Sequence, residues 1–286
     1  MPNESQRADT DIDVLIPTRD RPAELATTLA GLAAQDFPSF RVVLSDQSDQ
    51  PPGPAALAMV RVLRQRGIQV LTLRNMPRRG LAHQRDFLLR QARSPYVLFL
   101  DDDIWLQPGA VRTLYEAVRE LRCGLVGFAP QGLSYSDDRR PAELEPYEEW
   151  AGRPRPERIT QDSPEWRRWT LHNAANLVHL AERLSLRPGE RRAYKIAWVG
   201  ACVLFDRAAL ETAGGFSFWT SLPAEHCGED VVAQLRVMRR YGGAGILPSA
   251  AVHLESPTTV PNRQVEARHV MSQDACSPVE QTGHSR

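Results

Sequence analysis

Cysteine is scarce in this chain, and long apolar runs are absent from it. The four cysteines are widely spread and form no CxxC pair, which argues against a zinc site or a disulfide framework and fits a reducing compartment. No apolar run approaches the roughly 18 residues that a membrane span requires, and the polar N-terminus lacks the features of a secretory signal. We therefore expect a cytoplasmic protein without a membrane span, for which peripheral contact with a membrane stays open.

An excess of charge of either sign is also missing. Lysine plus arginine and aspartate plus glutamate both number 35, so the formal net charge is zero. This balance implies no broad basic surface, and we expect no nucleic-acid partner. Because the net charge is zero, recognition must depend on local charge. The 286 residues, 42% of them hydrophobic, are enough to bury one large core.

What the sequence does contain is an alternation of short apolar runs and segments with helical spacing. Leu25, Leu29 and Leu32, for example, recur at three- and four-residue steps, as in a helix that packs on a sheet. The pattern predicts strands over residues 14–18, 41–44, 68–73 and 96–100, and helices over 21–35, 55–65 and 81–92. Such β-then-α units in succession favour a mainly parallel sheet covered on both faces.

The segment from about 132 to 195 differs from this pattern. It is rich in proline, arginine, glutamate and tryptophan, and it is interpreted as an insertion with an amphipathic helix near Trp166–Leu184. Trp150, Trp166 and Trp169 either anchor this insertion on the core or stack on an acceptor, and the anchoring role is favoured.

The α/β pattern resumes after the insertion. An apolar strand is expected over 196–205 and a helix over 231–241, whereas the polar ends show no periodicity. The expected organisation is a single domain over 11–257, with a first half 11–130, the insertion at about 132–195, a second half 196–257, and flexible tails 1–10 and 258–286.

The acidic triplet Asp101-Asp102-Asp103 directly follows the apolar run YVLFL. It therefore lies at the carboxyl end of a predicted strand, where open α/β sheets bind their ligands. Carboxylates separated by one residue can face a hard cation together, so Asp101 and Asp103 are the candidate pair for Mg²⁺ or Mn²⁺. The alternative is an acidic first turn of a helix over 104–118.

Two further acidic segments are candidates for chemistry. Glu229 and Asp230, in HCGED, enter the predicted helix over 231–241, and capping of that helix is the simpler interpretation when they are taken alone. Asp46, in SDQSD beyond the second strand, could accept hydrogen bonds from a nucleobase edge or a ribose, although a plain Asx-rich turn is the favoured interpretation when the segment is taken alone.

Taken in chain order, these motifs resemble the family 2 glycosyltransferases of the GT-A fold. The matching segments, in the family's order, are IPTRDR (16–21), SDQSD (45–49), GLAHQRD (80–86), FLDDD (99–103), GGF (214–216) and GED (228–230). Departures from the family pattern fall at Ser45, Gln47, Gln84 and Asp86, and they concern the identity of the nucleotide. The resemblance implies a GT-A type, mainly parallel Rossmann-like sheet flanked by helices, with a helical insertion before the acceptor-side half.

The same resemblance implies an inverting, metal-dependent transfer of a sugar from a nucleoside diphosphate to a hydroxyl group of a glycan, a lipid-linked sugar or another acceptor. Asp103 is then the direct ligand of Mg²⁺ or Mn²⁺, with Asp101 reaching the ribose or the metal through water. Asp230 is the implied general base, and Glu229 orients the acceptor or caps the helix. A UDP-sugar is favoured on the strength of Asp46. The residues expected to contact the nucleotide sugar are Pro17, Thr18, Arg19, Asp46, Arg85, Asp101 and Asp102.

Three aromatic residues complete the candidate site. His253, in AVHLE, is a candidate metal ligand, although a lone histidine is more often structural. Phe218 and Trp219 either stack on an acceptor sugar or anchor their loop.

Two other functions are weighed against the glycosyltransferase. A metal-dependent nucleotidyltransferase should carry a glycine-rich loop after its first strand, and PTRDR contains no glycine. A catalytically silent sugar-nucleotide binder needs no general base, so the presence of both Asp103 and Asp230 argues against it.

Overall fold

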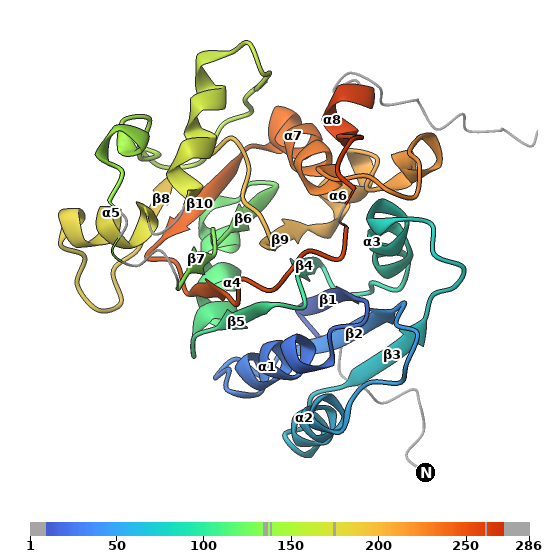
Figure 1. The fold of residues 1–286 in the computed structure, drawn as a ribbon. Helices are drawn as coiled ribbons and strands as arrows, with labels where there is room; N and C mark the ends of the chain where they lie inside the picture. The colour runs from blue at the N-terminus through green and yellow to red at the C-terminus, as the bar shows by residue number, and fades with distance from the viewer. Residues whose placement is uncertain (1–9, 134–136, 138, 174–175, 261, 272–286) are drawn as a thin grey trace, which may run out of the picture.

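The computed structural model describes residues 10–133, 137, 139–173, 176–260 and 262–271 (Figure 1). A large mixed sheet forms the centre, and its strands are parallel except β9 and β8. Its spatial order is β3 (Val70–Arg74), β2 (Phe40–Asp46), β1 (Ile12–Thr18), β4 (Tyr96–Leu100), β9 (Cys202–Asp206), β6 (Leu125–Gly127), β10 (Gly243–Leu247), β8 (Arg192–Tyr194). The mainly parallel sheet predicted from the sequence is confirmed.

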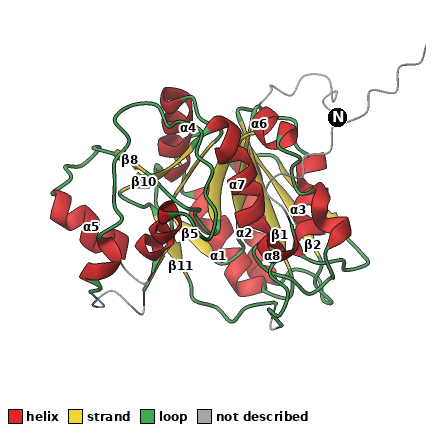
Figure 2. Ribbon diagram, turned by 90° about the horizontal axis from the view of Figure 1, so that it is seen from above, coloured by secondary structure: helices red, strands yellow, loops and turns green. Residues whose placement is uncertain are grey.

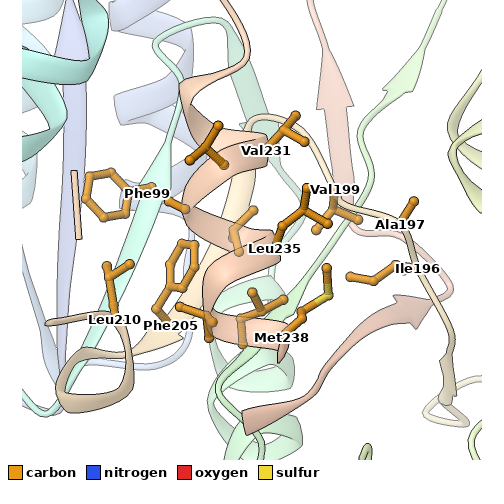
Figure 3. Close-up of a cluster of buried hydrophobic side chains, with 14 of the residues drawn as sticks. Phe99, Ile196, Ala197, Val199, Phe205, Leu210, Val231, Leu235 and Met238 are labelled. Carbon is orange, nitrogen blue, oxygen red and sulfur yellow. The ribbon is translucent and has the colours of Figure 1, made fainter. Parts of the chain in front are cut away.

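Helices cover both faces of this sheet (Figures 1 and 2). Because strand side chains alternate between faces, Val14 and Ile16 of β1 join one hydrophobic cluster and Leu15 joins the other. The first cluster contains the apolar sides of α1 (Pro22–Ala33), α2 (Pro54–Gln65) and α4 (Ala110–Leu121). The second contains those of α3 (Leu81–Arg90), α6 (Arg207–Thr212) and α7 (Glu229–Tyr241). Figure 3 shows this second cluster around α7, where Leu235 and Met238 pack near Phe99 and Phe205.

A second, three-stranded sheet crosses the end of β4. It pairs β5 (Ile104–Leu106) antiparallel with β11 (Ala251–His253), and β11 parallel with β7 (Gln131–Gly132). The acidic triplet therefore leads into a strand, and α4 begins only at Ala110, so the alternative of an acidic helix start is wrong. The register pairs His253 with Ile104, which brings this histidine beside the triplet.

The insertion contains less regular helix than the sequence predicts. Instead of one helix near Trp166–Leu184, a 3-10 helix spans Pro164–His172 and α5 spans Asn176–Leu184; residues 174–175 lie outside the described part. A further 3-10 helix spans Pro141–Leu144. Leu144, Leu171 and Leu177 are buried in the same cluster as α7, so the insertion is packed on the core.

Two segments near the chain's end differ from the prediction. The strand expected over 196–205 is shorter in the structure, where it is β9 (Cys202–Asp206). Residues 196–199 form a loop instead, and its apolar side chains pack beside α7 (Figure 3). Residues 262–271 belong to the predicted flexible tail, but they lie against α7 and include α8 (Ala267–Val270). Fully buried Ala267 donates its amide to Cys227, at 2.8 Å, and explains this attachment. The expectations for residues 1–9 and 272–286 fall outside the described residues.

None of the helices within the described part of the chain is long and apolar enough to cross a bilayer.

Candidate active site

Four of the six motifs, IPTRDR, GLAHQRD, FLDDD and GED, contribute residues to one cavity at the carboxyl ends of β1 and β4. Successive connections leave β1 toward opposite sides of the sheet, since β2 flanks it on one side and β4 on the other, and ligands bind at such switch points. The central cavity has a volume of about 320 Å³. Its wall comes from six parts of the chain: Pro17, Thr18, Arg19 and Arg21; Leu81, Gln84 and Arg85; Asp101, Asp102 and Asp103; His226, Cys227, Gly228, Glu229 and Asp230; His253; and Ser256, Thr258, Thr259, Val260 and Arg263.

The three aspartates after β4 have different surroundings. Asp102 accepts hydrogen bonds from the Thr18 hydroxyl at 2.7 Å and from the Arg21 guanidinium at 3.1 Å. Burial raises the pKa of Asp102 to about 7, against the opposing effects of Thr18 and Arg21. The side chain of Asp101 is 32% exposed, compared with 7% for Asp102 and 6% for Asp103. Asp101 is therefore the most accessible of the three to a bound ligand, whereas Asp102 secures β1 and α1 to the site.

Asp103 is held between two cationic or hydrogen-bonding side chains. Its Oδ2 accepts a hydrogen bond from Arg21 at 2.7 Å and lies 3.6 Å from Nε2 of His253. Nδ1 of His253 accepts the amide of Glu255 at 2.8 Å, so a neutral ring carries its proton on Nε2, toward Asp103. In this arrangement His253 fits a donor to Asp103 better than a metal ligand, because ligation through Nε2 requires that proton to leave.

The residues present fit a divalent cation that is shared with a substrate. Among the described residues, no three histidine, cysteine, aspartate or glutamate side chains converge on one point. Mg²⁺ and Mn²⁺ sites in phosphate-transferring proteins, however, commonly use one or two carboxylates and complete their shell with phosphate oxygens and water. Asp101 and Asp103 supply such a pair, and Arg21 must share or release Asp103 when a cation binds there.

A buried ion network links β4, α3 and α7. Arg85 donates to Glu229 at 3.0 Å and to Asp101 at 2.8 Å, and its guanidinium lies 5.7 Å from the centre of the Phe99 ring. Burial disfavours the charged guanidinium, but Asp101 and Glu229 outweigh this effect and raise the pKa of Arg85. Its positive charge is thus matched by two carboxylates of the protein, and Glu229 is held away from solvent.

Asp230 occupies the first turn of α7 at the edge of the cavity. Gly228 precedes the helix with a φ of 75°, a conformation that glycine adopts at no steric cost. Burial raises the pKa of Asp230 to about 7; the neighbouring Glu229 adds to the rise and Arg85 opposes it. A carboxylate with a pKa near neutrality is suited to take up a proton at physiological pH.

A second cavity adjoins the first, and Asp230 lines both. Its volume is about 460 Å³. Asp101, Asp230 and His253 are common to the two cavities, and the remaining wall is formed by Ala129, Pro130, Gly132, Trp169, His172, Asn173, Trp198, Gly200, Ala201 and Glu255. A carboxylate between two cavities can contact a ligand in each of them.

Asp46 lies beside the central cavity rather than in it. It lines a smaller cavity of about 250 Å³ that shares Thr18 with the central one, together with the apolar side chains of Leu25, Pro51 and Pro52. Its Oδ1 accepts the amide of Ser48 at 2.8 Å, as in the Asx turn that the sequence suggests.

The structure does not bring Phe218 and Trp219 to either cavity, which corrects the proposed acceptor contact. They lie in the 3-10 helix Ser217–Ser221. Phe218 is buried with the Arg236 guanidinium 5.0 Å from its ring centre, and Trp219 donates to Asp86 at 3.2 Å. Their rings are thus engaged in anchoring this loop to α3 and α7.

His226 shows why two distant motifs meet. Its Nε2 accepts the amide of Ala82 at 3.1 Å, and its Nδ1 lies 2.7 Å from the carbonyl of Pro223. His226, from the HCGED segment, thus caps the start of α3. A Cβ on Gly80 would lie 2.6 Å from Cε1 of His226, and Gly80 has a φ of 93°. The glycine of GLAHQRD is therefore required for this contact, and sequence reasoning missed it.

Other residues at the site also escaped the sequence analysis. Arg21 stood inside the IPTRDR motif, but nothing in the sequence showed that it pairs with the acidic triplet. Arg263 lies in the polar segment predicted to be a tail, where no periodicity signals a role. Trp198 lies inside the apolar run 196–205, which predicts only a strand.

A ligand cavity outside the carboxyl ends of parallel strands is typical of open α/β folds. The model of the family described as glycosyl transferase family 2 matches residues 13–183, more than half of the chain, and the chain belongs to this family. The match ends before α7, so Asp230 lies outside it. Among curated proteins, no sequence matches the chain.

Solved structures share the fold. S. aureus TarS 1-349 superposes with a TM-score of 0.55 and 16% identity, over 85% of this chain and 59% of that one. The same protein in complex with UDP-GlcNAc gives a TM-score of 0.53 and 16% identity, over 88% of this chain and 60% of that one. The chain thus spans about three fifths of the length of TarS 1-349, and the likeness establishes a GT-A type fold.

Proposed function

We propose that this protein is an inverting glycosyltransferase that moves a sugar from a nucleoside diphosphate, with UDP favoured, to an acceptor hydroxyl group. One observation carries the proposal: Asp230 and the acidic triplet, 127 residues apart between Asp103 and Asp230, line the same cavity. The central cavity would hold the donor, and the second cavity offers the acceptor a path to Asp230 from the other side.

The proposed reaction is a single displacement. The acceptor oxygen attacks the anomeric carbon, the bond from that carbon to the diphosphate oxygen breaks, and Asp230 takes the acceptor's proton. A single positioned base and attack opposite the leaving group invert the configuration at the anomeric carbon. The raised pKa of Asp230 suits this task, because the carboxylate must bind a proton readily as the attack proceeds.

The leaving diphosphate gains negative charge in this step. A divalent cation at Asp101 and Asp103 would neutralise that charge. The protein's own cations at the same cavity include Arg19 and Arg263. Arg263 donates to the uncharged hydroxyl of Thr258 at 3.0 Å, which leaves its charge suited to a phosphate oxygen.

A uracil base is proposed because of the cavity around Asp46. Its apolar walls can pack on a flat ring, and a carboxylate can accept the hydrogen of an imide N–H. S. aureus TarS, which shares the fold, has been solved with UDP-GlcNAc, and this supports the same choice.

The proposal is tested by thermal denaturation with UDP, GDP and dTDP, each with and without Mn²⁺. A ligand that binds only the folded state raises the apparent melting temperature, so we expect the largest rise with UDP and Mn²⁺ together. A larger rise with GDP or dTDP would overturn the choice of base. If none of the three nucleotides raises the melting temperature, the proposed function is wrong.

Turnover separates the proposal from its two alternatives. With a nucleotide sugar and an acceptor, a glycosyltransferase releases a nucleoside diphosphate, whereas a nucleotidyltransferase releases pyrophosphate from a nucleoside triphosphate. In Asp230→Asn we expect the release of nucleoside diphosphate to fall while the thermal shift with UDP and Mn²⁺ persists. A silent binder would show no turnover in either protein.

A further inference from the structure

The insertion presents two tryptophan rings to the second cavity. Trp169 and Trp198 both line it, and their rings are almost parallel, with 9° between the planes and 6.5 Å between the centroids. Trp169 is 39% exposed, although large aromatic side chains are usually well buried. An aromatic face that stays accessible beside a cavity is suited to contact a ligand.

The backbone that carries these rings is firmly held. Trp169 lies in the 3-10 helix Pro164–His172, where Leu171 is fully buried and Arg168 pairs with Glu157 at 2.8 Å. Trp198 stands between two buried residues that pack beside α7 (Figure 3). Both rings are therefore positioned before any ligand binds, and little ordering is required on binding.

Hydrogen-bonding groups complete the wall. Asn173 offers an amide, and Asp101, Asp230 and Glu255 offer carboxylates. A sugar ring has an apolar face of C–H groups and a rim of hydroxyl groups, and this wall provides a partner for each. Among the described residues no lysine or arginine lines this cavity, whereas three carboxylates do, and this balance disfavours phosphorylated or otherwise anionic saccharides.

We propose that the second cavity is the acceptor subsite and that it binds a neutral saccharide. The ring of this saccharide packs on the exposed face of Trp169, and the hydroxyl group to be glycosylated points toward Asp230. This inference rests on the proposed function, because it assigns Asp230 the role of base. It also gives the insertion the role of selecting the acceptor.

Gly200 provides a steric test of the same cavity. It lines the second cavity, and a Cβ built on it meets no atom within 4 Å. The Cβ of a leucine at this position therefore meets no neighbour, and we expect its longer side chain to reduce the space in the cavity that Gly200 lines. Its effect on saccharide binding does not depend on removing an aromatic ring.

The experiment measures binding to immobilised neutral oligosaccharides of glucose, galactose, mannose and N-acetylglucosamine, with phosphorylated forms beside them. We expect wild-type protein to bind at least one neutral saccharide. Trp169→Ala and Gly200→Leu should weaken this binding by about tenfold or more, since a central aromatic contact often dominates an interface. Trp169→Phe should retain most of it. Leu57→Ala, which truncates a 44% exposed apolar residue on α2, is the control and should bind as wild type does.

Three results would overturn the inference: no neutral saccharide binds, phosphorylated forms bind more tightly, or the two variants bind as tightly as wild type. The thermal shift with UDP and Mn²⁺ is recorded for every variant. A retained shift shows that the variant is folded and that its donor cavity is intact. If that shift is present and the saccharide result fails, only the acceptor subsite is wrong; if no nucleotide shifts the melting temperature, the proposed function fails instead.

Discussion

The buried pair of Arg85 and Glu229 allows a quantitative test of how the site is stabilised. Arg85→Met keeps a long unbranched side chain at this position but leaves Glu229, 2% exposed, without its guanidinium partner. Removing one member of a buried ion pair typically costs about 3–5 kcal/mol, because the other charge stays desolvated. Asp101 also loses a partner, but its side chain is 32% exposed and solvent compensates much of that loss.

Glu229→Gln should cost less than Arg85→Met. Arg85 keeps Asp101 as a partner at 2.8 Å, so we expect about 1–3 kcal/mol for the loss of one charge-assisted hydrogen bond. In the double variant Arg85→Met/Glu229→Gln no buried charge is left unpaired at Glu229. Its stability should therefore exceed that of Arg85→Met, and the two losses should be clearly non-additive.

The assay is urea-induced unfolding followed by tryptophan fluorescence, with all four proteins measured at pH 7. Equal slopes of the unfolding free energy against urea concentration are needed for the comparison. A loss below about 1 kcal/mol in Arg85→Met, or a double variant whose losses simply add, would show that Glu229 does not depend on Arg85. The electrostatic account of this network would then be wrong.

Four other predictions concern three positions, Asp230, Arg21 and Gly80. The value of kcat/KM should rise with pH through about 7 as Asp230 loses its proton, and Asp230→Asn should lower kcat by about 10²–10⁴-fold. Because folding raises the pKa of Asp230, the free energy of unfolding of the wild type should fall relative to that of Asp230→Asn as the pH rises from about 4 to about 7. Urea unfolding across that range measures this difference, and parallel profiles of unfolding free energy against pH would refute the pKa shift. Arg21→Met should tighten Mn²⁺ binding to the nucleotide-free protein by about tenfold, read from the Mn²⁺ EPR signal, whereas Arg19→Met, which removes a charge from the same cavity, should change it much less. Gly80→Ala should lower the free energy of unfolding by more than about 2 kcal/mol, because the added Cβ collides with the capping His226. Gly67→Ala, at a position with a similar φ of 83° and no atom within 4 Å of the added Cβ, should lower it by about 1 kcal/mol, and equal losses would contradict the collision.

Much of the first half of the fold follows from the sequence, because β1, β2 and β3 are separate apolar runs and each is followed by a helix of regular spacing. The run at 96–100 is β4, and the run with Leu25, Leu29 and Leu32 is α1. The strand at 104–106 could not be predicted, because three apolar residues fit a strand or a helix equally well and only their pairing with β11 decides between the two. For residues 262–271, which the sequence analysis placed in a flexible tail, the attachment runs through backbone contacts and the small buried residue Ala267, which leave no periodic signal in the sequence.

At the site, the sequence identified chemical groups better than it identified their partners. Carboxylates after a strand were recognisable, but the pairing of Arg21 with Asp103 and the tautomer of His253 depend on geometry across β1, β4 and β11. Trp219 was ambiguous for the same reason: an aromatic residue in a loop becomes an anchor or a ligand contact according to which surface it meets.

The position of Asp230 relative to the acidic triplet is determined by buried contacts. Arg85 joins α7 to α3 and to Asp101, and His226 joins the segment before α7 to the start of α3. Both contacts lie inside the protein, where a hydrogen bond is electrostatically stronger than in water. If Asp230 is the base, as proposed, an acceptor bound on the insertion side would meet a carboxylate whose position relative to Asp101 and Asp103 is already fixed.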